Sequence, residues 1–352
     1  CVEINSSNST NMYIVMQKSA DSGNTWPNSY TVVGHHTDSL DKPWIAADTN
    51  SGSPYKNNVY GCWRDDSGST NIFFKRYVVS GSSTIPYDSD SNEKQLDIGA
   101  LSGCSIAIGP QGQVYVVYST DLNSGGGTVY LQRNLHGGDP TMWDTTRYTV
   151  GTFNSIPAPY CNYNGGTYEC LNGYNGIPFR VNHFPSVAVD SSGSVHVTWM
   201  TYTNTNTLTN IMYTNSNSCG TSTGTCTFAT PIQVNLDTGA RDHWEPAITV
   251  SGSGNVIHVT AYDRRDDSQN IFYRPYDYYC SYGPLINCMS QSQWRNIQSS
   301  SAGSSNLDQG AYIDDYHGVT TSAARQAYDV WTDSRNLGSN HNYDIYSELT
   351  TG

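Results

Sequence analysis

Cationic side chains are scarce in this sequence. Among its 352 residues, 17 are Lys or Arg and 30 are Asp or Glu, so the formal net charge at pH 7 is -13. A field of this sign repels phosphate backbones and anionic lipid headgroups, which excludes nucleic acid and membrane surfaces from the expected partners. The sequence also lacks an apolar run of about 18 residues, so no membrane insertion is predicted. It opens without a charged-then-apolar signal segment, as expected of a mature, soluble product.

Apolar residues are scarce as well. They make up 36% of the chain, below the roughly 45% of an average globular protein. Leu is rare, whereas the sequence contains 32 Gly and 27 Tyr. This composition is typical of many short strands joined by turns, around a core of aromatic and β-branched side chains. A closed all-β domain can reach this length, and we predict one domain over residues 1–352.

The nine Cys include no CxxC pair, which argues against a metal or redox centre. Three pairs instead flank short segments rich in Gly, Asn, Ser or Thr, as local disulfides would: Cys161 with Cys170, Cys219 with Cys226, and Cys280 with Cys288. Cys62 and Cys104 stand in neighbouring repeats and form a fourth expected bridge, which leaves Cys1 for an intermolecular bond or a modification. Four disulfides predict an extracellular or cell-surface protein. Buried reduced thiols in a cytosolic protein are the alternative.

A unit of four strands recurs along the chain. Its first strand, strand A, is apolar and begins near residues 43, 104, 185, 246 and 318. An alternating strand B follows, such as QVYVVYST from Gln113, then a strand C such as NIFYRPYD from Asn270, and a short strand D such as TPIQVN from Thr230. Period-two alternation marks these segments as strands, and the recurrence of such a unit predicts an all-β fold of the β-propeller kind.

The repeat predicts six antiparallel four-stranded blades with disulfide-stapled loops, and five blades as the alternative. Residues 2–34 form a partial N-terminal blade that lacks a clear strand A, and residues 2–5 are a candidate for one missing strand. The last blade ends at strand C. Residues 152–182 lie outside the repeat as a loop insertion.

An eight-residue motif falls between strands C and D of the partial blade: Ser19-Ala20-Asp21-Ser22-Gly23-Asn24-Thr25-Trp26. It resembles the Asp box of the sialidase-like, BNR-repeat propellers. The segments DKPWIAAD, FPSVAVDSSGSVHVTW and AYDRRDD are similar to secreted members of that family. In such a turn the Asp and Ser side chains bond the backbone, Gly accepts a positive φ and Trp packs on the blade. The resemblance therefore implies a structural role for Ser19, Asp21, Gly23, Thr25 and Trp26.

Residues before strand A and after strand B converge on one face of a propeller. A sialidase-like hydrolase needs arginines for the substrate carboxylate, an acid for the leaving group, and a Tyr paired with a carboxylate. The resemblance implies the following candidates: Arg64, Arg264, Arg265 and Arg335 for the arginine clamp, Asp315 for the acid, and Glu245 with Tyr262 or Tyr316 for the nucleophile.

Three observations oppose catalysis. No F-R-I-P segment precedes the first blade, since Phe179-Arg180 lies mid-chain and continues differently. Only one of the five Glu residues, Glu245, is well placed. Arg and Asp also recur after strand B in three of the five units, as repeated loop-stabilising ion pairs would.

We therefore predict a non-catalytic structural or adhesive protein that self-associates into filaments through the open sheet edges at its chain ends. The alternatives are a glycan-binding, lectin-like propeller that takes extracellular glycans and an exo-sialidase-like glycoside hydrolase.

A metal site is not favoured. Asp88, Asp90 and Asn92 begin like a calcium loop, but Glu93 stands where the turn Gly belongs and Gly99 where the bidentate Glu belongs. A solvated acidic loop is the preferred interpretation. No HExxH motif indicates zinc, and no cofactor is expected.

Overall fold

The computed structural model divides the chain into two compact units, each with its own hydrophobic core. The structure describes residues 2–4, 12–26, 31–36, 40–66, 69–77, 93–99, 101–120, 125–163, 166–173, 176–203, 208–220, 224–237, 239, 241–251, 255–267, 272–283, 287–305, 313, 316–321, 326–333 and 344–351. Unit 1 comprises Cys1–Asp121, Val129–Thr149 and Ser218–Cys226, and unit 2 comprises Leu122–Thr128, Val150–Asn217 and Thr227–Gly352.

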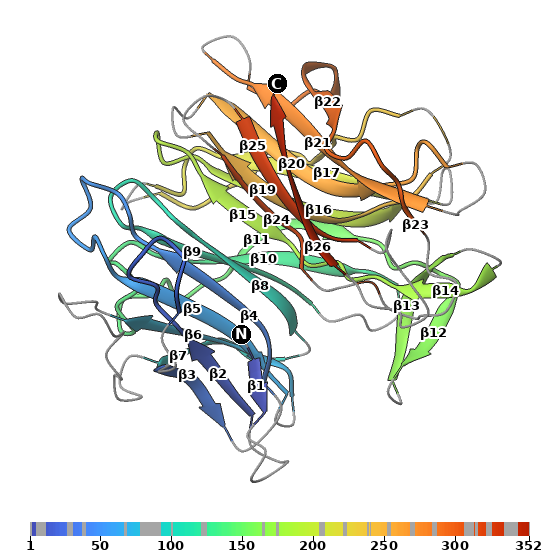
Figure 1. The fold of residues 1–352 in the computed structure, drawn as a ribbon. Coiled ribbons are helices and arrows are strands. Elements are labelled where there is room, and N and C mark those ends of the chain that lie inside the picture. Colours follow the sequence, from blue (N-terminus) through green and yellow to red (C-terminus); the bar gives the residue numbers. More distant parts are fainter. Residues whose placement is uncertain are drawn as a thin grey trace. The chain divides into compact units, whose positions relative to one another are not determined.

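Unit 1 is built from antiparallel sheets in chain order (Figure 1, blue to teal). The first contains β1 (Val2–Ile4), β2 (Met12–Met16) and β3 (Thr31–His36). The second contains β4 (Leu40–Ala47), β5 (Val59–Asp65), β6 (Asn71–Tyr77) and β7 (Glu93–Asp97). The third contains β8 (Leu101–Ile108), β9 (Val114–Thr120), β10 (Gly127–Asn134) and β11 (Tyr148–Phe153), the last of which leads into unit 2.

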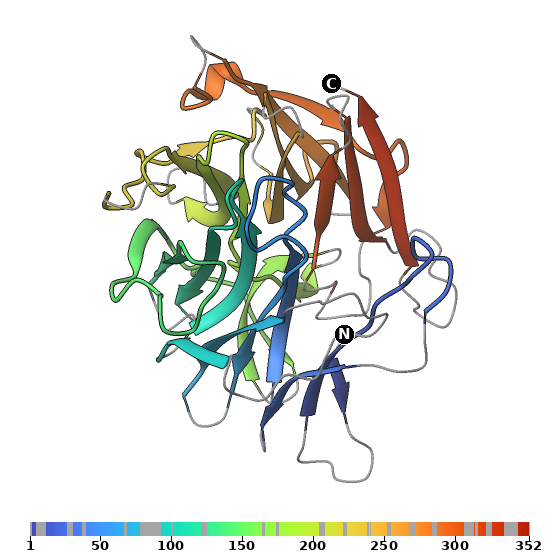
Figure 2. The same cartoon turned by 90° about the vertical axis from the view of Figure 1, so that its left-hand side faces the viewer.

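Unit 2 continues the same pattern after a small three-stranded sheet, β12 (Tyr160–Tyr163), β13 (Gly166–Asn172) and β14 (Pro178–Arg180). The next sheet contains β15 (Ser186–Val189), β16 (Val195–Thr203), β17 (Leu208–Ser216) and β18 (Ile232–Gln233). It is followed by β19 (His243–Val250), β20 (Val256–Asp263), β21 (Phe272–Ser281) and β22 (Arg295–Gln298), with β23 (Ser304–Ser305) also paired to β21. The last sheet contains β24 (Gly318–Thr321), β25 (Gln326–Asp333) and β26 (Asp344–Thr351), which run side by side in red in Figure 2.

The repeat predicted from the sequence is present in six sheets. Four of them follow the order of strands A to D from one edge, and the N-terminal and last sheets contain three strands each among the described residues. The all-β propeller with six blades is therefore confirmed. Val2–Ile4 does form a strand, which pairs antiparallel with β2 in the N-terminal sheet. The predicted insertion at residues 152–182 contains the additional sheet β12–β14. That the whole chain forms one domain stays a prediction.

Three A strands begin earlier than predicted. Strands β4, β8 and β19 each start three residues before the predicted positions 43, 104 and 246. The reason is a bulge near the start of each strand, where the pairing register shifts and then continues. A bulge inserts unpaired backbone without ending the strand, so a Pro at this point, such as Pro43 or Pro246, marks the bulge and not the strand end.

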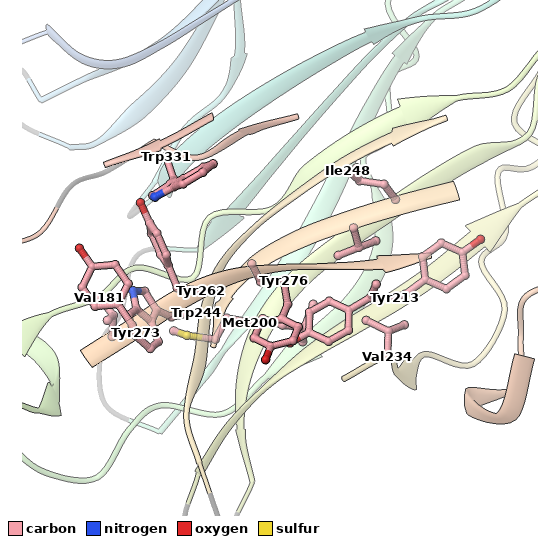
Figure 3. Packing of buried hydrophobic residues seen from close by; sticks show 14 of the residues in the cluster. Val181, Met200, Tyr213, Val234, Trp244, Ile248, Tyr262, Tyr273, Tyr276 and Trp331 are labelled. Atoms are coloured by element: carbon pink, nitrogen blue, oxygen red, sulfur yellow. The ribbon is translucent and has the colours of Figure 1, made fainter. Parts of the chain in front are cut away.

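Aromatic side chains dominate the core of unit 2. The rings of Trp244, Tyr262 and Tyr273 lie 5.0 to 5.5 Å apart, at centroid distances that favour tilted and edge contacts. In Figure 3, the side chain of Tyr262 points toward Trp331 of the last sheet. All four residues are buried. Large aromatic rings thus supply the buried area that a Leu-poor sequence otherwise lacks.

The four predicted disulfides are all present: Cys62–Cys104, Cys161–Cys170, Cys219–Cys226 and Cys280–Cys288. The first joins β5 to the neighbouring strand β8, and the other three close short loops. Cys1 lies outside the described residues. No helix within the described part of the chain has the length and hydrophobicity needed to span a membrane.

The disulfides allow a stability test within unit 1. Cys62–Cys104 spans 42 residues and Cys219–Cys226 spans 7, so the loop-entropy relation gives a loss of about 4 kcal/mol for the first bridge and about 2 kcal/mol for the second. Double Cys→Ser variants should reproduce this order in urea unfolding monitored by Trp fluorescence. All four sulfurs belong to buried residues, so the two variants are matched in burial. Equal losses would contradict an entropic origin.

Candidate functional site

The start of β19 brings together most of the unit 2 residues that the sequence singled out. His243 pairs with Asp263 and Trp244 pairs with Tyr262 across β19 and β20. The two strand ends therefore place residues 242–245 beside residues 262–267, and we call these two segments the β19 edge. His317, which precedes β24, reaches the same edge, since its ring lies 4.9 Å from the Tyr262 ring.

The insertion packs against this edge through Arg264. The Arg264 guanidinium lies 4.8 Å from the ring of Phe179 in β14 and 5.2 Å from the ring of Trp244. Its Nη1 donates a hydrogen bond to the backbone oxygen of Asn172 in β13. Burial lowers the pKa of Arg264 to about 10. With 1% of its surface exposed, Arg264 anchors the insertion and does not present donors to a ligand.

Arg265 points the other way, into a buried acid–base cluster. Its backbone N and Nε donate hydrogen bonds to the two carboxylate oxygens of Asp263, and its Nη1 donates to Oδ1 of Asn296. The Tyr278 hydroxyl donates a hydrogen bond to Oδ2 of Asp263, the oxygen that also accepts from Arg265 Nε, and it accepts a hydrogen bond from Arg265 Nη2. Both guanidinium groups are therefore engaged within the protein, and the arginine clamp stays a prediction.

His243 completes the cluster. Its Nε2 lies 2.9 Å from Oδ1 of Asp237 and 3.2 Å from Oδ2 of Asp263. Burial alone would lower the pKa of His243, but the two carboxylates raise it to about 10. Burial would raise the pKa of Asp263, but His243 and Arg265 hold it well below its usual value. Two carboxylates are thus balanced by two cations.

The same cluster offers a possible metal ligand set, since ligand atoms of Asp237, His243 and Asp263 lie within 4.8 Å of one another. The donor set does not suit a metal ion, however. The Asp263 oxygen that would face the ion already accepts hydrogen bonds from Arg265 and Tyr278. Because a cation there would have to displace a guanidinium, we assign the cluster to structure.

Glu245 occupies an unusual backbone position in the β19 bulge. Its φ is 51°, in the left-handed region, although it is not a glycine. The bulges of β4 and β8 contain Lys42 with φ 53° and Gly103 with φ 56°. Both charged side chains are buried, with 6% of Glu245 and 4% of Lys42 exposed. Two of the three bulges, those of β4 and β19, therefore hold a buried charged residue at the position where the β8 bulge has Gly.

The remaining candidates are placed as follows. The Tyr262 hydroxyl accepts a hydrogen bond from the backbone N of Thr332 and donates to the Thr332 oxygen, so it links β20 to β25. Tyr316 is exposed by 43%. Arg64 lies in unit 1, where its Nε donates to Asp66 and its Nη1 donates to Ser102. The other candidates, for catalysis or calcium, lie outside the described residues: Asp315, Arg335, Asp88, Asp90 and Asn92.

One buried pair was missed from sequence. Glu169 of the insertion accepts a hydrogen bond from the backbone N of Ile156 and lies 2.9 Å from Nε2 of His183, whose Nδ1 lies 2.9 Å from the Met200 oxygen. His183 lies just before the strand A that was predicted to begin near residue 185. Glu169 has no such position, because the insertion has no counterpart in the repeat. Its contact to Ile156 lies within the insertion, and its contact to His183 links the insertion to Met200 of β16.

The Ser19–Trp26 motif forms a self-contained turn between β2 and β3. The Ser19 hydroxyl accepts from Gly23 N, and the Asp21 carboxylate accepts from the backbone N and the hydroxyl of Thr25. These hydrogen bonds, chiefly those from Thr25, lower the pKa of Asp21 to about 2. Trp26 is 57% exposed and lines a hollow together with Ile14, Val15 and Met16 of β2.

No family model and no curated protein matches this chain. Among solved structures it is similar to an α-L-arabinanase of Penicillium chrysogenum complexed with arabinobiose, at 9% identity and TM-score 0.47 over 88% of this chain and 93% of that chain. It is also similar to an α-L-arabinofuranosidase of Fusarium graminearum at 8% identity and TM-score 0.46, over 88% and 92%. A third is an α-L-arabinofuranosidase of Lactobacillus brevis at 10% identity and TM-score 0.42, over 88% and 90%. At such identities no site residue carries over.

These matches contradict the prediction of a non-catalytic structural or adhesive protein that self-associates. The matched proteins are glycan-degrading enzymes. The repeated Arg–Asp pairs that motivated the prediction are present.

The acid–base cluster predicts a pH dependence of stability. An unfolded His loses its proton near pH 6.5, whereas folded His243 retains it to about pH 10. Its contribution is therefore fully present below pH 6.5 and is lost as pH rises toward 10, with a slope approaching about 1.4 kcal/mol per pH unit. Urea unfolding from pH 6 to 10 should show this decline, and His243→Gln should flatten it. His136→Gln, at an exposed His, is the control, and an unchanged slope in His243→Gln would refute the assignment.

Proposed function

We propose that this chain is an extracellular glycan-degrading enzyme of the glycoside hydrolase class, and that Glu245 is one of its catalytic carboxylates. The observation that carries the proposal is the left-handed backbone of Glu245 in the β19 bulge. The four disulfides support the extracellular location.

The conformation of Glu245 is costly for a residue with a Cβ. The left-handed region destabilises an L-residue by about 1–2 kcal/mol, and Gly103 in the β8 bulge has the same geometry without that cost. Burial of a carboxylate adds a desolvation penalty. Strain and buried charge at a strand end are typical of functional sites, where a bulge aims a side chain. Fold stability alone would favour Gly at this position.

The surroundings of Glu245 suit a hydrolase. Glycoside hydrolysis requires a carboxyl group that is rigidly held beside the scissile bond. At the β19 edge, the aromatic core under Trp244 and the insertion anchored by Arg264 fix the strand that carries Glu245. Tyr316, exposed and next to His317 at the same edge, is the proposed second participant. Asp315 remains the proposed acid from the sequence.

A neutral glycan is the favoured substrate. A sialidase-type site needs arginines that are free to hold the substrate carboxylate, whereas Arg264 and Arg265 are engaged in the packing of the insertion and in the Asp263 cluster. We therefore interpret the sialidase-like resemblance as a similarity of the blades and not of substrate specificity.

The test is glycan cleavage by wild type and two variants of one residue. Wild type should release reducing ends from at least one of a panel of arabinan, xylan, galactan and sialyllactose, with a neutral glycan as the substrate. Glu245→Gln should lose at least about 100-fold in rate, within the range of a single general acid or base. Glu245→Gly should be equally inactive but as stable as wild type or more stable, because it removes the left-handed strain.

Glu348→Gln is the matched control, since Glu348 lies exposed on β26. Full activity in Glu245→Gln, or no cleavage of any glycan by folded wild type, would disprove the proposal. A large loss of stability in Glu245→Gly would remove the observation on which it rests.

A further inference from the structure

Unit 2 contains a pocket at the end of its sheets opposite the β19 edge. It lies where β15 ends and β20 begins, and its volume is about 500 Å³, within the range of roughly 300–1,000 Å³ for small-molecule sites. We propose that this pocket binds a neutral mono- or disaccharide and forms a second glycan site that is separate from the β19 edge.

The pocket wall is held by a continuous hydrogen-bond network. Oδ2 of Asp190 accepts from the Tyr282 hydroxyl at 2.7 Å and lies 3.3 Å from Nε2 of His196. Nδ1 of His196 lies 2.8 Å from the Tyr213 hydroxyl, which also accepts from Nδ2 of Asn215. Asp190 and His196 are both more than nine-tenths buried. The polar groups of the wall are therefore set in place before a ligand arrives.

A disulfide fixes the second wall of the pocket. Tyr282 and Asn287 lie within the loop that the Cys280–Cys288 disulfide closes, and the Cys288 oxygen accepts a hydrogen bond from Nε1 of the buried Trp294. Asn287 in turn accepts a hydrogen bond from Asn215 through its backbone oxygen. The two sheets thus hold the pocket open between them, and pre-organised groups bind at a lower entropic cost.

The lining is chemically suited to a sugar. Nine of the fourteen lining residues carry a hydrogen-bonding side chain, and half-buried Phe228 and Tyr282 add ring surface. Sugars combine hydroxyl groups with apolar C–H faces, so they use both kinds of surface. The many hydrogen-bonding groups of the lining suit the hydroxyl groups, and the two ring faces suit the C–H faces.

Charge decides between neutral and anionic ligands. No Lys or Arg lines the pocket, and Asp190 is its single carboxylate. Burial would raise the pKa of Asp190, but hydrogen bonds from His196, Ser192 and Tyr282 hold it well below its usual value. The pocket therefore offers a carboxylate-bearing sugar no Lys or Arg as a partner, and the hydrogen bonds that Asp190 already accepts leave it little capacity for an added cation.

The experiment is calorimetric titration of the Glu245→Gln protein, which cannot cleave the probes under the proposed function. The probes are maltose, cellobiose, lactose and arabinobiose, with 3′-sialyllactose as the anionic counterpart of lactose and glucosamine as a cationic probe. At least one neutral disaccharide should bind, and sialyllactose should bind about tenfold more weakly than lactose. Phe228→Ala should weaken neutral binding by about tenfold or more. Tyr328→Ala, at an exposed aromatic residue of β25, should leave it unchanged.

The outcomes separate this site from the proposed active site. Binding that survives in Glu245→Gln and is lost in a folded Phe228→Ala supports the pocket, even if wild type cleaves nothing. Binding that is insensitive to Phe228→Ala places the sugar elsewhere and overturns the proposal. No binding of any neutral disaccharide, tighter binding of sialyllactose, or a preference for glucosamine overturns it as well.

Discussion

The pairing of buried tyrosine hydroxyl groups with carboxylates is a constraint on which much of this structure depends. A chain with few Leu must bury Tyr and Trp to build its core, and each of these rings carries one polar group that is costly to leave unpaired. Tyr278 and Tyr276 donate to Asp263 and Asp266, Tyr282 donates to Asp190, and in unit 1 Tyr118 donates to Asp97. Acidic residues therefore lie near the strand ends, where they accept hydrogen bonds from these hydroxyl groups. The negative charge of the chain is in part a consequence of its aromatic core.

This pairing explains why Tyr–Asp contacts in the structure are poor guides to catalysis. In each pair for which both shifts are resolved, the pKa of the Tyr is raised and that of the Asp is lowered, with desolvation as the largest influence on the Tyr. The proton therefore stays on the phenol, whereas a tyrosine nucleophile requires its transfer to the carboxylate. These pairs act as fixed dipoles that align sheets. Glu245 differs from these pairs because its left-handed backbone lies in the β19 bulge, a position where the β4 bulge has Lys42.

The sequence predicted the blades and the disulfides because both depend on local pattern. Alternation and turn residues fix a strand within one repeat, and Cys62 and Cys104 occupy related positions of adjacent repeats. The predicted starts of these strands were three residues too late, because a bulge leaves no signal in the sequence other than Pro43 and Pro246. The opposite directions of Arg264 and Arg265 were likewise hidden, since they follow from how the insertion packs on Trp244. Glu169 could not be found, because a contact between an insertion and a repeat has no periodicity.

The two proposed sites of unit 2 lie at opposite ends of one strand. β20 runs from Val256, next to Ile257 at the pocket, to Asp263 at the β19 edge, and eight residues of strand span about 25 Å. A short oligosaccharide would occupy one site at a time, whereas a polymer is long enough to engage the pocket while another part of it remains free. Tethering in this way raises the effective concentration of the polymer near the protein without adding contacts at the cleavage site. An affinity for neutral sugar at the pocket would thus favour polymeric over short substrates, because the strand between the sites is rigid and keeps their separation constant.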